Sequence, residues 1–442
     1  MPMRKLATHM PTSLRGIANR ARRDGQARFR DLYRLLDEEN LKLCYQELRK
    51  SAAPGVDKVT VREYGKNLDE NVARLVERLK GKRYRAKLIR RKHIPKGKGK
   101  TRPLGIPRLE DKLLQQAVAK ILSAIFEQDF LSVSWGYRLG RGAREASQTL
   151  AGRLAVGRYQ WVVDADLRSY FDTIDHDWLL RMLEQRVDDR ALLGLIGKWL
   201  KAGILEEDGR VVDPITGTPQ GGIVSPVLAN VYLHYVLDLW FEKRIRRKSR
   251  GQATMLRYAD DFVAAFEHEA DARGFLDQLR SRLEKFKLSF SEEKTALVRF
   301  ARHDPENRNG GFDFLGFRYH WEATRKGNRK VQRITAPTKR QASERRLREW
   351  IKEHRHLRVR ELLKRLSRKL TGYWNYYGVS GNTPALGKFW REVLRALYKW
   401  LNRRSQKKSC TWDRLYRILD THRVPGPRIV TDRQLKLWLP ST

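Results

Sequence analysis

Two adjacent aspartates, Asp260 and Asp261, lie in the otherwise apolar and aromatic stretch MLRYADDFVAAF, residues 255–266. Burying one ionised carboxylate is costly unless its charge is compensated, and two neighbouring carboxylates push the pKa of one of them upward. A divalent cation would remove both penalties, because it prefers carboxylate oxygens as ligands. The stretch by itself also fits a polar turn without any chemistry.

A second acidic position follows another apolar segment. In WVVDADLRSYFDTIDH, residues 161–176, the strand-like run WVV leads directly into Asp164 and Asp166. Phosphoryl and nucleotidyl transfer commonly use two Mg²⁺ ions, and carboxylates at strand ends can supply oxygen ligands for them. One strand-end aspartate and the adjacent aspartate pair, meeting across a sheet, would form such a site.

The hydrophobic pattern predicts the elements that position these aspartates. Leu256, Tyr258, Phe262 and Val263 predict two short strands, so the aspartate pair lies at or beside the turn of a β-hairpin. The basic stretch 82–112 predicts a second hairpin, with KGKGK at its tip. The pattern further predicts helices over 109–129, 177–202 and 268–287, a helix from the Gly/Pro-rich loop 213–226 to about 247, and strands within 312–321. Interleaved strands and helices are typical of the α+β class.

After residue 333 the composition changes to helix-forming residues with many Arg and Lys. Between Leu386 and Leu401, apolar residues keep the spacing of one helix face, and basic residues occupy much of the remaining surface. We therefore expect a separate, basic, all-α domain. The expected organisation is a basic N-terminal extension that enters the first domain (1–80), an α+β region (81–333), the helical domain (334–405) and a basic C-terminal tail that could bind DNA (406–442).

The charge of the chain indicates a polyanionic partner. The 442 residues include 93 Lys and Arg against 51 Asp and Glu, which gives a net charge of +42. No apolar run of about 18 residues is present, so we expect no membrane span. Cys44 and Cys410, the two cysteines, provide neither a disulfide framework nor a CxxC zinc pattern. We expect a bacterial, cytoplasmic, nucleic-acid-associated protein; the Arg-rich first 25 residues only weakly favour import into an organelle.

Four motifs follow one another along the chain: IPKGKGKTRPLGIP at 94–107, DLRSYFDTIDH at 166–176, TPQGGIVSPVLANVYL at 218–233 and YADD at 258–261. Together with FDFLGFRYHW and GYWNYYG, they resemble the reverse transcriptase/maturase encoded by group II introns, over about residues 50–405. The resemblance implies an α+β right-hand polymerase, with fingers and a palm built on an antiparallel sheet, followed by an all-α basic thumb/maturase domain. The chain resembles the compact type of this family, which lacks the His-Asn-His endonuclease domain, because the cysteine pairs of that domain are absent.

The resemblance also implies the catalytic metal site. Asp166, Asp260 and Asp261 match the catalytic, metal-binding aspartates, and the backbone carbonyl of Leu167 is a further expected ligand. The expected cofactor is Mg²⁺, as two ions. Asp261 ranks below the other two aspartates, because side chains alternate across a strand and only the turn geometry lets both members of the pair point inward. The local rivals of Asp166 are Asp164 and Asp172.

Phe171 lies five residues after Asp166, where similar enzymes carry an aromatic ring that closes the pocket against a nucleotide 2′-hydroxyl. Such a ring favours dNTP over NTP, and packing of Phe171 or Tyr170 in the core is the alternative. Gln220 matches a residue that lines the pocket of the incoming nucleotide, and Gly221 permits a close backbone approach. The other expected nucleotide-binding residues are Lys96 and Arg102 of the basic hairpin, Leu167, and Lys294, for which a solvated surface lysine is the alternative.

The GYWNYYG motif combines aromatic residues with basic surroundings. Such rings can stack on bases, although aromatic residues at helical spacing also fit a core. The expected RNA-binding residues are Tyr373, Trp374, Tyr376, Arg391, Arg395, Lys399 and Arg403. The expected partners are group II intron RNA, an RNA template with a DNA primer, target DNA and dNTP substrates, with no membrane.

Three other functions remain open from the sequence. The first is an RNA-binding splicing cofactor with little polymerase activity, which the intact aspartates, Phe171 and Gln220 disfavour. The second is an RNA-templated RNA polymerase, which the bulk of Phe171 disfavours. The third is a reverse transcriptase with a defence or other non-intron role, which the GYWNYYG helical region disfavours.

Overall fold

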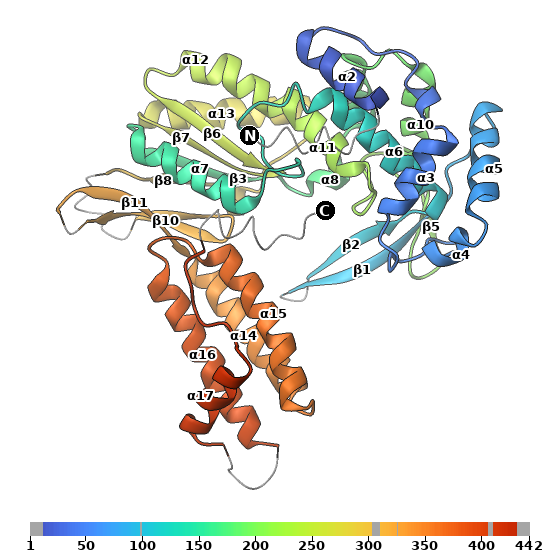
Figure 1. The fold of residues 1–442 in the computed structure, drawn as a ribbon. Helices are drawn as coiled ribbons and strands as arrows, with labels where there is room; N and C mark the ends of the chain where they lie inside the picture. The colour runs from blue at the N-terminus through green and yellow to red at the C-terminus, as the bar shows by residue number, and fades with distance from the viewer. Residues whose placement is uncertain (1–11, 98–99, 303–309, 325, 405–409, 431–442) are drawn as a thin grey trace. The chain divides into compact units, whose positions relative to one another are not determined.

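The computed structural model describes residues 12–97, 100–302, 310–324, 326–404 and 410–430 (Figure 1). The chain divides into two compact units. The first unit contains 1–142, 165–264 and 270–296, and the second contains 143–164, 265–269 and 297–442. The segment 143–164 thus groups with the C-terminal residues, whereas the sequence placed it within the α+β region. Helices and antiparallel strand pairs occur together, as expected for the α+β class.

Helices make up most of the first unit. They are α2 (Thr12–Arg23), η1 (Tyr33–Leu35), α3 (Glu38–Glu47), α4 (Val61–Gly65), α5 (Leu68–Lys80), α6 (Leu109–Phe126), α8 (Tyr170–Thr173), α9 (His176–Glu184), α10 (Arg190–Leu200), α11 (Ser225–Leu233), η2 (His234–Asp238), η3 (Phe241–Ile245), α12 (Arg246–Lys248), α13 (Glu269–Lys285) and η4 (Glu292–Lys294). Helix α6 matches the predicted helix at 109–129, and its residues Leu113, Leu114 and Val118 have no exposed surface. It therefore provides a central part of the core of this unit.

The helical pattern predicted at 177–202 is present as two helices, α9 and α10. The segment between them forms a bridge from Val187 to Phe29, and the Asp189 carboxylate then accepts a 3.0 Å hydrogen bond from the Leu192 N–H. An aspartate that caps the N-terminus in this way begins a new helix. The helix predicted to run to about 247 is present as α11, η2, η3 and α12 in succession; η2 and η3 are π-helical turns.

Two four-stranded sheets have the orders β2-β1-β4-β5 and β6-β7-β3-β8, and a three-stranded sheet has the order β11-β10-β9. The strands are β1 (Ile89–Gly97), β2 (Lys100–Ile106), β3 (Trp161–Asp166), β4 (Ile204–Leu205), β5 (Val211–Val212), β6 (Ala253–Tyr258), β7 (Asp261–Phe266), β8 (Ala296–Arg299), β9 (Gly311–Phe314), β10 (Phe317–Ala323) and β11 (Arg329–Thr335). Both predicted hairpins are confirmed, as β1–β2 and β6–β7. The turn between β6 and β7 is two residues long, and its first residue, Ala259, has a φ of 60°.

The second unit combines the three-stranded sheet with helices α7 (Ala143–Val156), α14 (Pro337–Glu353), α15 (Val359–Tyr377), α16 (Thr383–Asn402) and α17 (Trp412–Thr421). Helix α17 lies in the segment whose structure the sequence left open. Its residues Leu415 and Leu419 are buried in the same hydrophobic core as Leu366 and Trp374. The helical domain therefore includes α17 and extends past residue 405. Among the described residues, no helix is both long enough and apolar enough to cross a bilayer.

Candidate active site

The end of β3 lies beside the turn between β6 and β7. Strands β3 and β7 are neighbours in their sheet, and the Leu167 N–H donates to the Asp260 carbonyl at 3.4 Å. Asp166 ends β3, Asp260 lies in the turn, and Asp261 begins β7. The structure thus brings together the three segments that carry the predicted catalytic aspartates. Leu167 is 2% exposed, and because its hydrocarbon side chain has no ligating atom, only its backbone carbonyl is a candidate ligand.

Lys294, at the end of η4, reaches this acidic group. Its Nζ donates to Asp166 Oδ2, and the Asp166 carbonyl accepts a 2.9 Å bond from the Ser291 N–H. The hydrogen bond with Asp166 raises the pKa of Lys294, and the charges of Asp166, Asp260 and Asp261 raise it further, against a lowering by partial burial. The positive charge of Lys294 therefore interacts favourably with all three carboxylates.

The chemistry of this donor set fits a divalent cation. The three acidic side chains offer only oxygen atoms as ligands, which Mg²⁺-like ions prefer. The carboxylates also stabilise a positive charge at this place, because the Lys294 ammonium is paired with Asp166. In the part of the chain that the structure describes, no group of three or more His, Cys, Asp or Glu side chains is arranged around one point as ready-made metal ligands. Asp166 Oδ2 instead accepts from Lys294 Nζ.

Phe171 packs against Tyr137, whose pKa is raised by partial burial and then by the charge of Asp260. The Phe171 side chain is half-buried, and its ring meets the ring of Tyr137 edge to face, with 6.2 Å between centroids. Tyr170, the alternative gate, is 2% exposed and donates its hydroxyl to the Ala229 carbonyl at 2.6 Å. Tyr170 is therefore a core residue, whereas the Phe171 ring remains partly accessible.

Tyr137 was not predicted from the sequence. Its ring is 54% exposed. Its pKa is raised, first by partial burial and then by the charge of Asp260, whereas the charge of Arg102 lowers it. Tyr137 therefore lies near an expected metal ligand, an expected phosphate ligand and Phe171. Nothing in SWGYRLG distinguishes this tyrosine from a core aromatic, so only the fold identifies it.

Gln220 lies in the loop that precedes α11. Its Nε2 donates to Asp172 Oδ2 at 3.2 Å, and its carbonyl accepts a 2.6 Å bond from the Gly105 N–H of β2. Gly221 has a φ of 114°, and a Cβ there would lie 2.7 Å from the Gly105 carbonyl oxygen, so glycine is required. Burial raises the pKa of Asp172, which Arg91 and Gln220 partly offset. Asp172, a rival metal ligand in the sequence, thus holds Gln220 in place.

The remaining predicted residues of this region are Arg102, Lys96 and Asp164. Arg102 is an exposed residue of β2 and pairs in register with Ile94 of β1. The side chain of Lys96 lies outside the described residues. Asp164, the other rival of Asp166, belongs to the second compact unit.

The aromatic residues of GYWNYYG pack within the second unit. Trp374 has no exposed surface, and its Nε1 donates to the Pro425 carbonyl at 2.9 Å. Tyr373 stacks on Phe389 with 3.8 Å between centroids, and the Tyr376 hydroxyl donates to the Leu315 carbonyl at 2.7 Å. A ring without accessible surface cannot stack on a base, so the expected RNA contact is wrong for Trp374. Tyr373 and Tyr376 are partly buried, with their best-defined contacts inside the protein.

Four cations surround Trp400 on the helical domain, and we call them the Trp400 cluster. Lys352, Arg355, Lys399 and Arg403 lie between 5.2 and 5.8 Å from the centre of its ring. All four side chains are exposed, and none forms an ion pair within the described part of the chain. Two of them, Lys399 and Arg403, were predicted RNA-binding residues.

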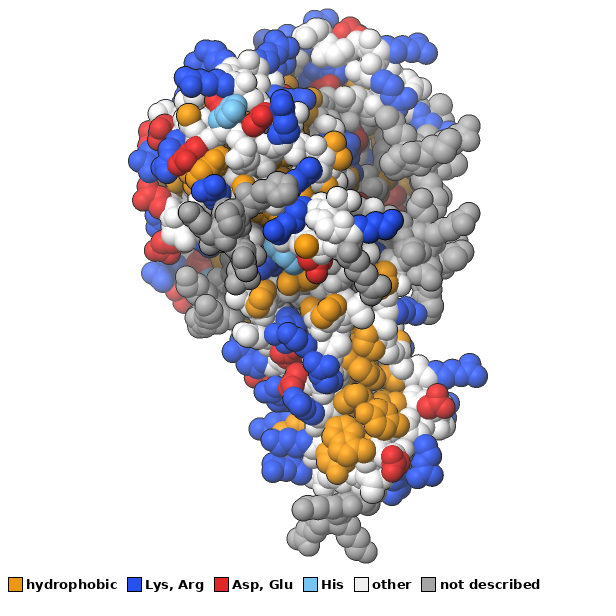
Figure 2. Space-filling view, turned by 90° about the vertical axis from the view of Figure 1, so that its left-hand side faces the viewer, with side chains coloured by type: hydrophobic (Ala, Val, Ile, Leu, Met, Phe, Trp, Pro, Cys, Tyr) orange, Lys and Arg blue, Asp and Glu red, His pale blue; other side chains and the backbone are white. Residues whose placement is uncertain are grey.

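The other two predicted cations of α16 differ in their surroundings. Arg391 is exposed, whereas Arg395 forms a 2.7 Å ion pair with Glu392. Figure 2 shows a hydrophobic patch on the helical domain with Lys and Arg side chains beside it. Exposed rings of this domain include Trp412 and Tyr416, which are 40% and 52% exposed.

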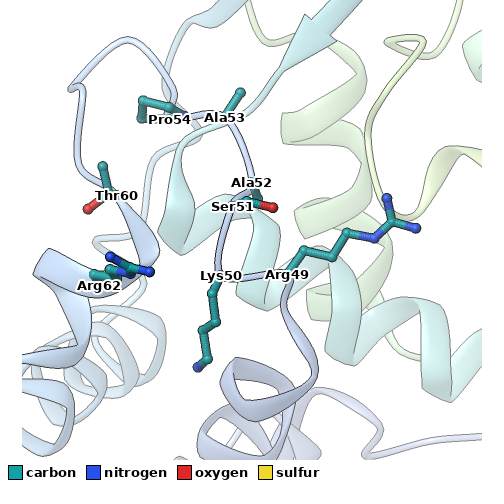
Figure 3. Close-up of a pocket in the computed structure, with 8 residues that line it drawn as sticks. All are labelled: Arg49, Lys50, Ser51, Ala52, Ala53, Pro54, Thr60 and Arg62. Atoms are coloured by element: carbon teal, nitrogen blue, oxygen red, sulfur yellow. The ribbon is translucent and has the colours of Figure 1, made fainter. Parts of the chain in front are cut away.

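A separate basic pocket lies between α3 and α4 in the first unit. Its volume is about 690 Å³, and its lining residues are Arg49, Lys50, Ser51, Ala52, Ala53, Pro54, Thr60 and Arg62 (Figure 3). The loop that forms it is tied to α6, because Lys112 Nζ donates to the Ala53 carbonyl at 2.5 Å and Arg108 Nε donates to Asp57 Oδ2 at 2.6 Å. Three basic side chains and no acid line this pocket, which suits an anionic ligand.

Comparison with known proteins identifies two matching families. Residues 94–319 match the family described as reverse transcriptase (RNA-dependent DNA polymerase), and residues 340–419 match the maturase-specific domain of group II introns. The chain is 32% identical over 308 residues to Protein YkfC of Escherichia coli (strain K12), which covers 63% of this chain and 78% of YkfC.

Two further relatives are associated with introns by name. The chain is 29% identical over 403 residues to Group II intron-encoded protein LtrA of Lactococcus lactis subsp. cremoris, which covers 73% of this chain and 65% of LtrA. It is 28% identical over 148 residues to Nuclear intron maturase 4, mitochondrial, of Arabidopsis thaliana, which covers 34% of this chain and 18% of that protein. The chain thus spans less than two thirds of either of these relatives.

Proposed function

We propose that this chain, which belongs to the reverse transcriptase (RNA-dependent DNA polymerase) family, is an RNA-directed DNA polymerase. The chain also carries a group II intron maturase-specific domain. We therefore propose that it also binds group II intron RNA and assists its splicing and mobility. The substrates are dNTPs and an RNA template with a DNA primer, and target DNA is a further partner. In this proposal the first unit supplies the fingers and palm of a right-hand polymerase, and the helical domain supplies its thumb. We place the activity in the cytoplasm of a bacterium, because YkfC and LtrA are proteins of bacteria.

One observation carries the proposal. Asp166 at the end of β3 and Asp260 in the β6–β7 turn lie in neighbouring segments, and a lysine ammonium contacts the first and is stabilised by the charge of the second. A splicing cofactor without polymerase activity has no need for a cation-attracting carboxylate group at this place. The observation therefore favours the polymerase over the purely RNA-binding alternative.

Asp166, Asp260 and Asp261 would hold two Mg²⁺ ions, with the Leu167 carbonyl as an additional ligand. Mg²⁺ bound there would neutralise the charge of the triphosphate and polarise the reacting oxygens. Lys294 holds Asp166 by its ion pair when no metal is bound, and it becomes available to a phosphate when that pair opens. The reaction joins the primer 3′ oxygen to the α-phosphate of the dNTP and releases pyrophosphate.

The other residues of the site position the nucleotide. Phe171 would lie beneath the sugar, with Tyr137 against the edge of its ring, so a 2′-hydroxyl would collide with the Phe171 side chain. Gln220 and Gly221 would line the base and sugar from the side of the loop before α11, fixed by Asp172 and Gly105. Arg102 and Lys96 of the β1–β2 hairpin would bind the triphosphate, for which the planar guanidinium of arginine is well suited.

Intron RNA would bind mainly through exposed cations. The Trp400 cluster and Arg391 provide positive charge without a described acidic partner, and the basic pocket between α3 and α4 provides a second group of cations. Phosphate contacts of this kind give affinity without sequence information. The sequence preference would therefore come from contacts other than these cations.

The test is a comparison of dCTP and CTP on one primed RNA template. We expect purified wild-type protein to extend the primer with dNTPs and to show a higher kcat/KM for dCTP than for CTP, because Phe171 occupies the space of a 2′-hydroxyl. Splicing would be followed separately, with a group II intron transcript at low Mg²⁺. A protein that binds the RNA tightly but extends no primer would support the splicing cofactor, and equal use of CTP would support an RNA polymerase.

A further inference from the structure

A fully buried ion pair lies directly behind the β6–β7 turn. Arg257 and Asp238 have no exposed side-chain surface, and they form two hydrogen bonds, Nε to Oδ1 at 2.7 Å and Nη2 to Oδ2 at 2.6 Å. Removing two charges from water is expensive, and replacement of such a pair by apolar residues is often neutral or stabilising. Stability alone therefore gives no sufficient reason for this pair.

The rest of the guanidinium is used to hold the segments around the turn. Nη1 donates to the Ala259 carbonyl at 2.9 Å and to Asn230 Oδ1 at 3.1 Å, and Nη2 donates to Ser134 Oγ at 2.8 Å. Together with the two bonds to Asp238, these contacts use the full donor capacity of an arginine. The ammonium group of a lysine could not reproduce them, because it is a point charge with three donors.

Ala259 is the residue whose conformation most needs support. It has a φ of 60°, which costs a residue with a Cβ on the order of 1 kcal/mol. It also precedes Asp260 and Asp261 directly, so its conformation determines the direction in which both carboxylates leave the turn. The hydrogen bond from Arg257 to its carbonyl holds the peptide unit at this point.

The same arginine is linked to the segment that carries Tyr137. The Arg257 N–H donates to the Val133 carbonyl, and the Arg257 carbonyl accepts from the Trp135 N–H. Gly136 packs so closely on the turn that a Cβ there would lie 2.3 Å from the Ala259 nitrogen, and Asn230 Nδ2 donates to the Gly136 carbonyl at 2.8 Å. One buried pair thus connects the metal-binding turn with the wall of the nucleotide pocket.

We propose that Arg257, paired with Asp238, is a positioning residue that sets the conformation of the β6–β7 turn and thereby aims Asp260 and Asp261. The inference rests on the proposed function, because it concerns how those carboxylates bind their cations. Arg257 touches neither substrate nor metal and acts through the Ala259 peptide. Its loss should therefore weaken metal binding and slow nucleotide incorporation, and leave the affinity for primed RNA nearly unchanged.

The test uses Arg257→Lys with Arg186→Lys as a matched control. Arg186 is 2% exposed, pairs with Asp129 and donates to the Ala21 and Asp24 carbonyls, so it makes similar contacts away from the turn. Substitutions in the residues that support metal ligands typically cost ~10–100-fold, and we expect Arg257→Lys to lower the single-turnover rate by that factor. Mn²⁺ binding without substrate, followed by electron paramagnetic resonance, should weaken, and amide exchange in the turn should accelerate. Arg186→Lys should change none of the three.

A double variant separates positioning from stability. Arg257→Met with Asp238→Leu removes both charges together, so it leaves no unpaired buried charge. It still loses the bonds to Ala259, Asn230 and Ser134, so its unfolding temperature is measured beside its Mn²⁺ affinity and rate, which should stay low in folded protein. This variant decides the question in the same way if Arg257→Lys does not fold. Wild-type Mn²⁺ affinity and rate in the double variant would overturn the inference. A wild-type protein that makes no DNA on an RNA template would instead overturn the proposed function.

Discussion

Positive charge is used in opposite ways in two regions of this molecule. Arg257 in the first unit has no exposed surface and pairs with Asp238, whereas the four cations around Trp400 in the second unit are exposed and pair with no described acid. A buried, paired arginine cannot attract a ligand, but it can fix a backbone. Exposed cations over an aromatic ring do not hold a backbone segment in place, but they remain available to a polyanion. From this difference we expect chemistry and RNA affinity to depend on separate sets of residues.

The largest effect is expected on RNA affinity, when the exposed cations of the Trp400 cluster are removed. Replacing the four cations of the Trp400 cluster by alanine removes up to four phosphate contacts, so the slope of log K against log salt should flatten by about 3. The incorporation rate at saturating primed RNA should stay near the wild-type value. The measurement is intron RNA binding at several salt concentrations.

The matched control for the Trp400 cluster is Arg395→Ala. This residue is also on α16, but Glu392 already neutralises it at 2.7 Å, so the slope should change by less than about 1. A full-sized effect of Arg395→Ala, together with an unchanged slope in the fourfold variant, would place the RNA surface elsewhere. Point substitutions are preferable to removal of residues 335–442, because Arg144 of α7 donates to the carbonyls of Asn375 and Gly378.

A smaller effect is expected at the nucleotide wall. Phe171→Val opens space beneath the sugar without touching the aspartates, and each ~1.4 kcal/mol of lost steric discrimination corresponds to a tenfold change. Relative use of CTP over dCTP should therefore rise tens- to hundreds-fold, as a change in the ratio of kcat/KM values. If wild-type protein discriminates but the ratio in Phe171→Val is unchanged, Tyr137 becomes the next residue to test.

The smallest effect concerns the pH dependence of stability beside the buried pair. Burial lowers the pKa of His234 to about 4, with Asp238 opposing and Arg257 adding to the shift. Because the unfolded chain binds a proton near pH 6.5, stability should be complete above that pH and decline as the pH falls toward 4. At pH 5.5 this loss is about 1.4 kcal/mol.

The variant that checks this prediction is His234→Leu, in which a similar apolar side chain replaces an imidazole. Urea unfolding at pH 7.5 and pH 5.5 should show a smaller decline in this variant than in the wild type. An equal decline in both proteins would mean that other groups cause the acid sensitivity. Within the part of the chain that the structure describes, His234 Nδ1 has no hydrogen-bond partner, and the ring meets the Phe130 ring edge to face with 5.6 Å between centroids, so leucine removes no hydrogen bond of this nitrogen.

Local patterns predicted much of the fold around the site. The β6–β7 hairpin follows from two aspartates within an apolar stretch, and α6 follows from strict helical spacing. The region 177–202 was predicted to be helical, but the boundary within it was not predicted, because the capping bond of Asp189 appears only in the folded chain. Cues of this kind depend on neighbours in sequence, and they fail where a side chain interrupts the pattern.

Contacts between distant residues were not predictable. Arg257 lies in the same short stretch as the predicted catalytic aspartates, but its role depends on contacts with Asp238, Asn230 and Ser134, the last of which is 123 residues away. Trp374 has a spacing that fits both a core and a binding surface, and its contact with Pro425, 51 residues away, decides for the core. Tyr137 reaches the site through the same long-range packing.

The central claim is that the aspartates perform chemistry while the exposed cations bind RNA. The most direct test measures primer extension and RNA affinity in the same preparations of wild type, Asp166→Asn and Asp260→Asn. Changes one step further from a metal already cost ~10–100-fold, so loss of a direct ligand should lower extension more than ~100-fold and leave the RNA dissociation constant within a few-fold. Near-normal extension by either variant would contradict the assignment of the active site.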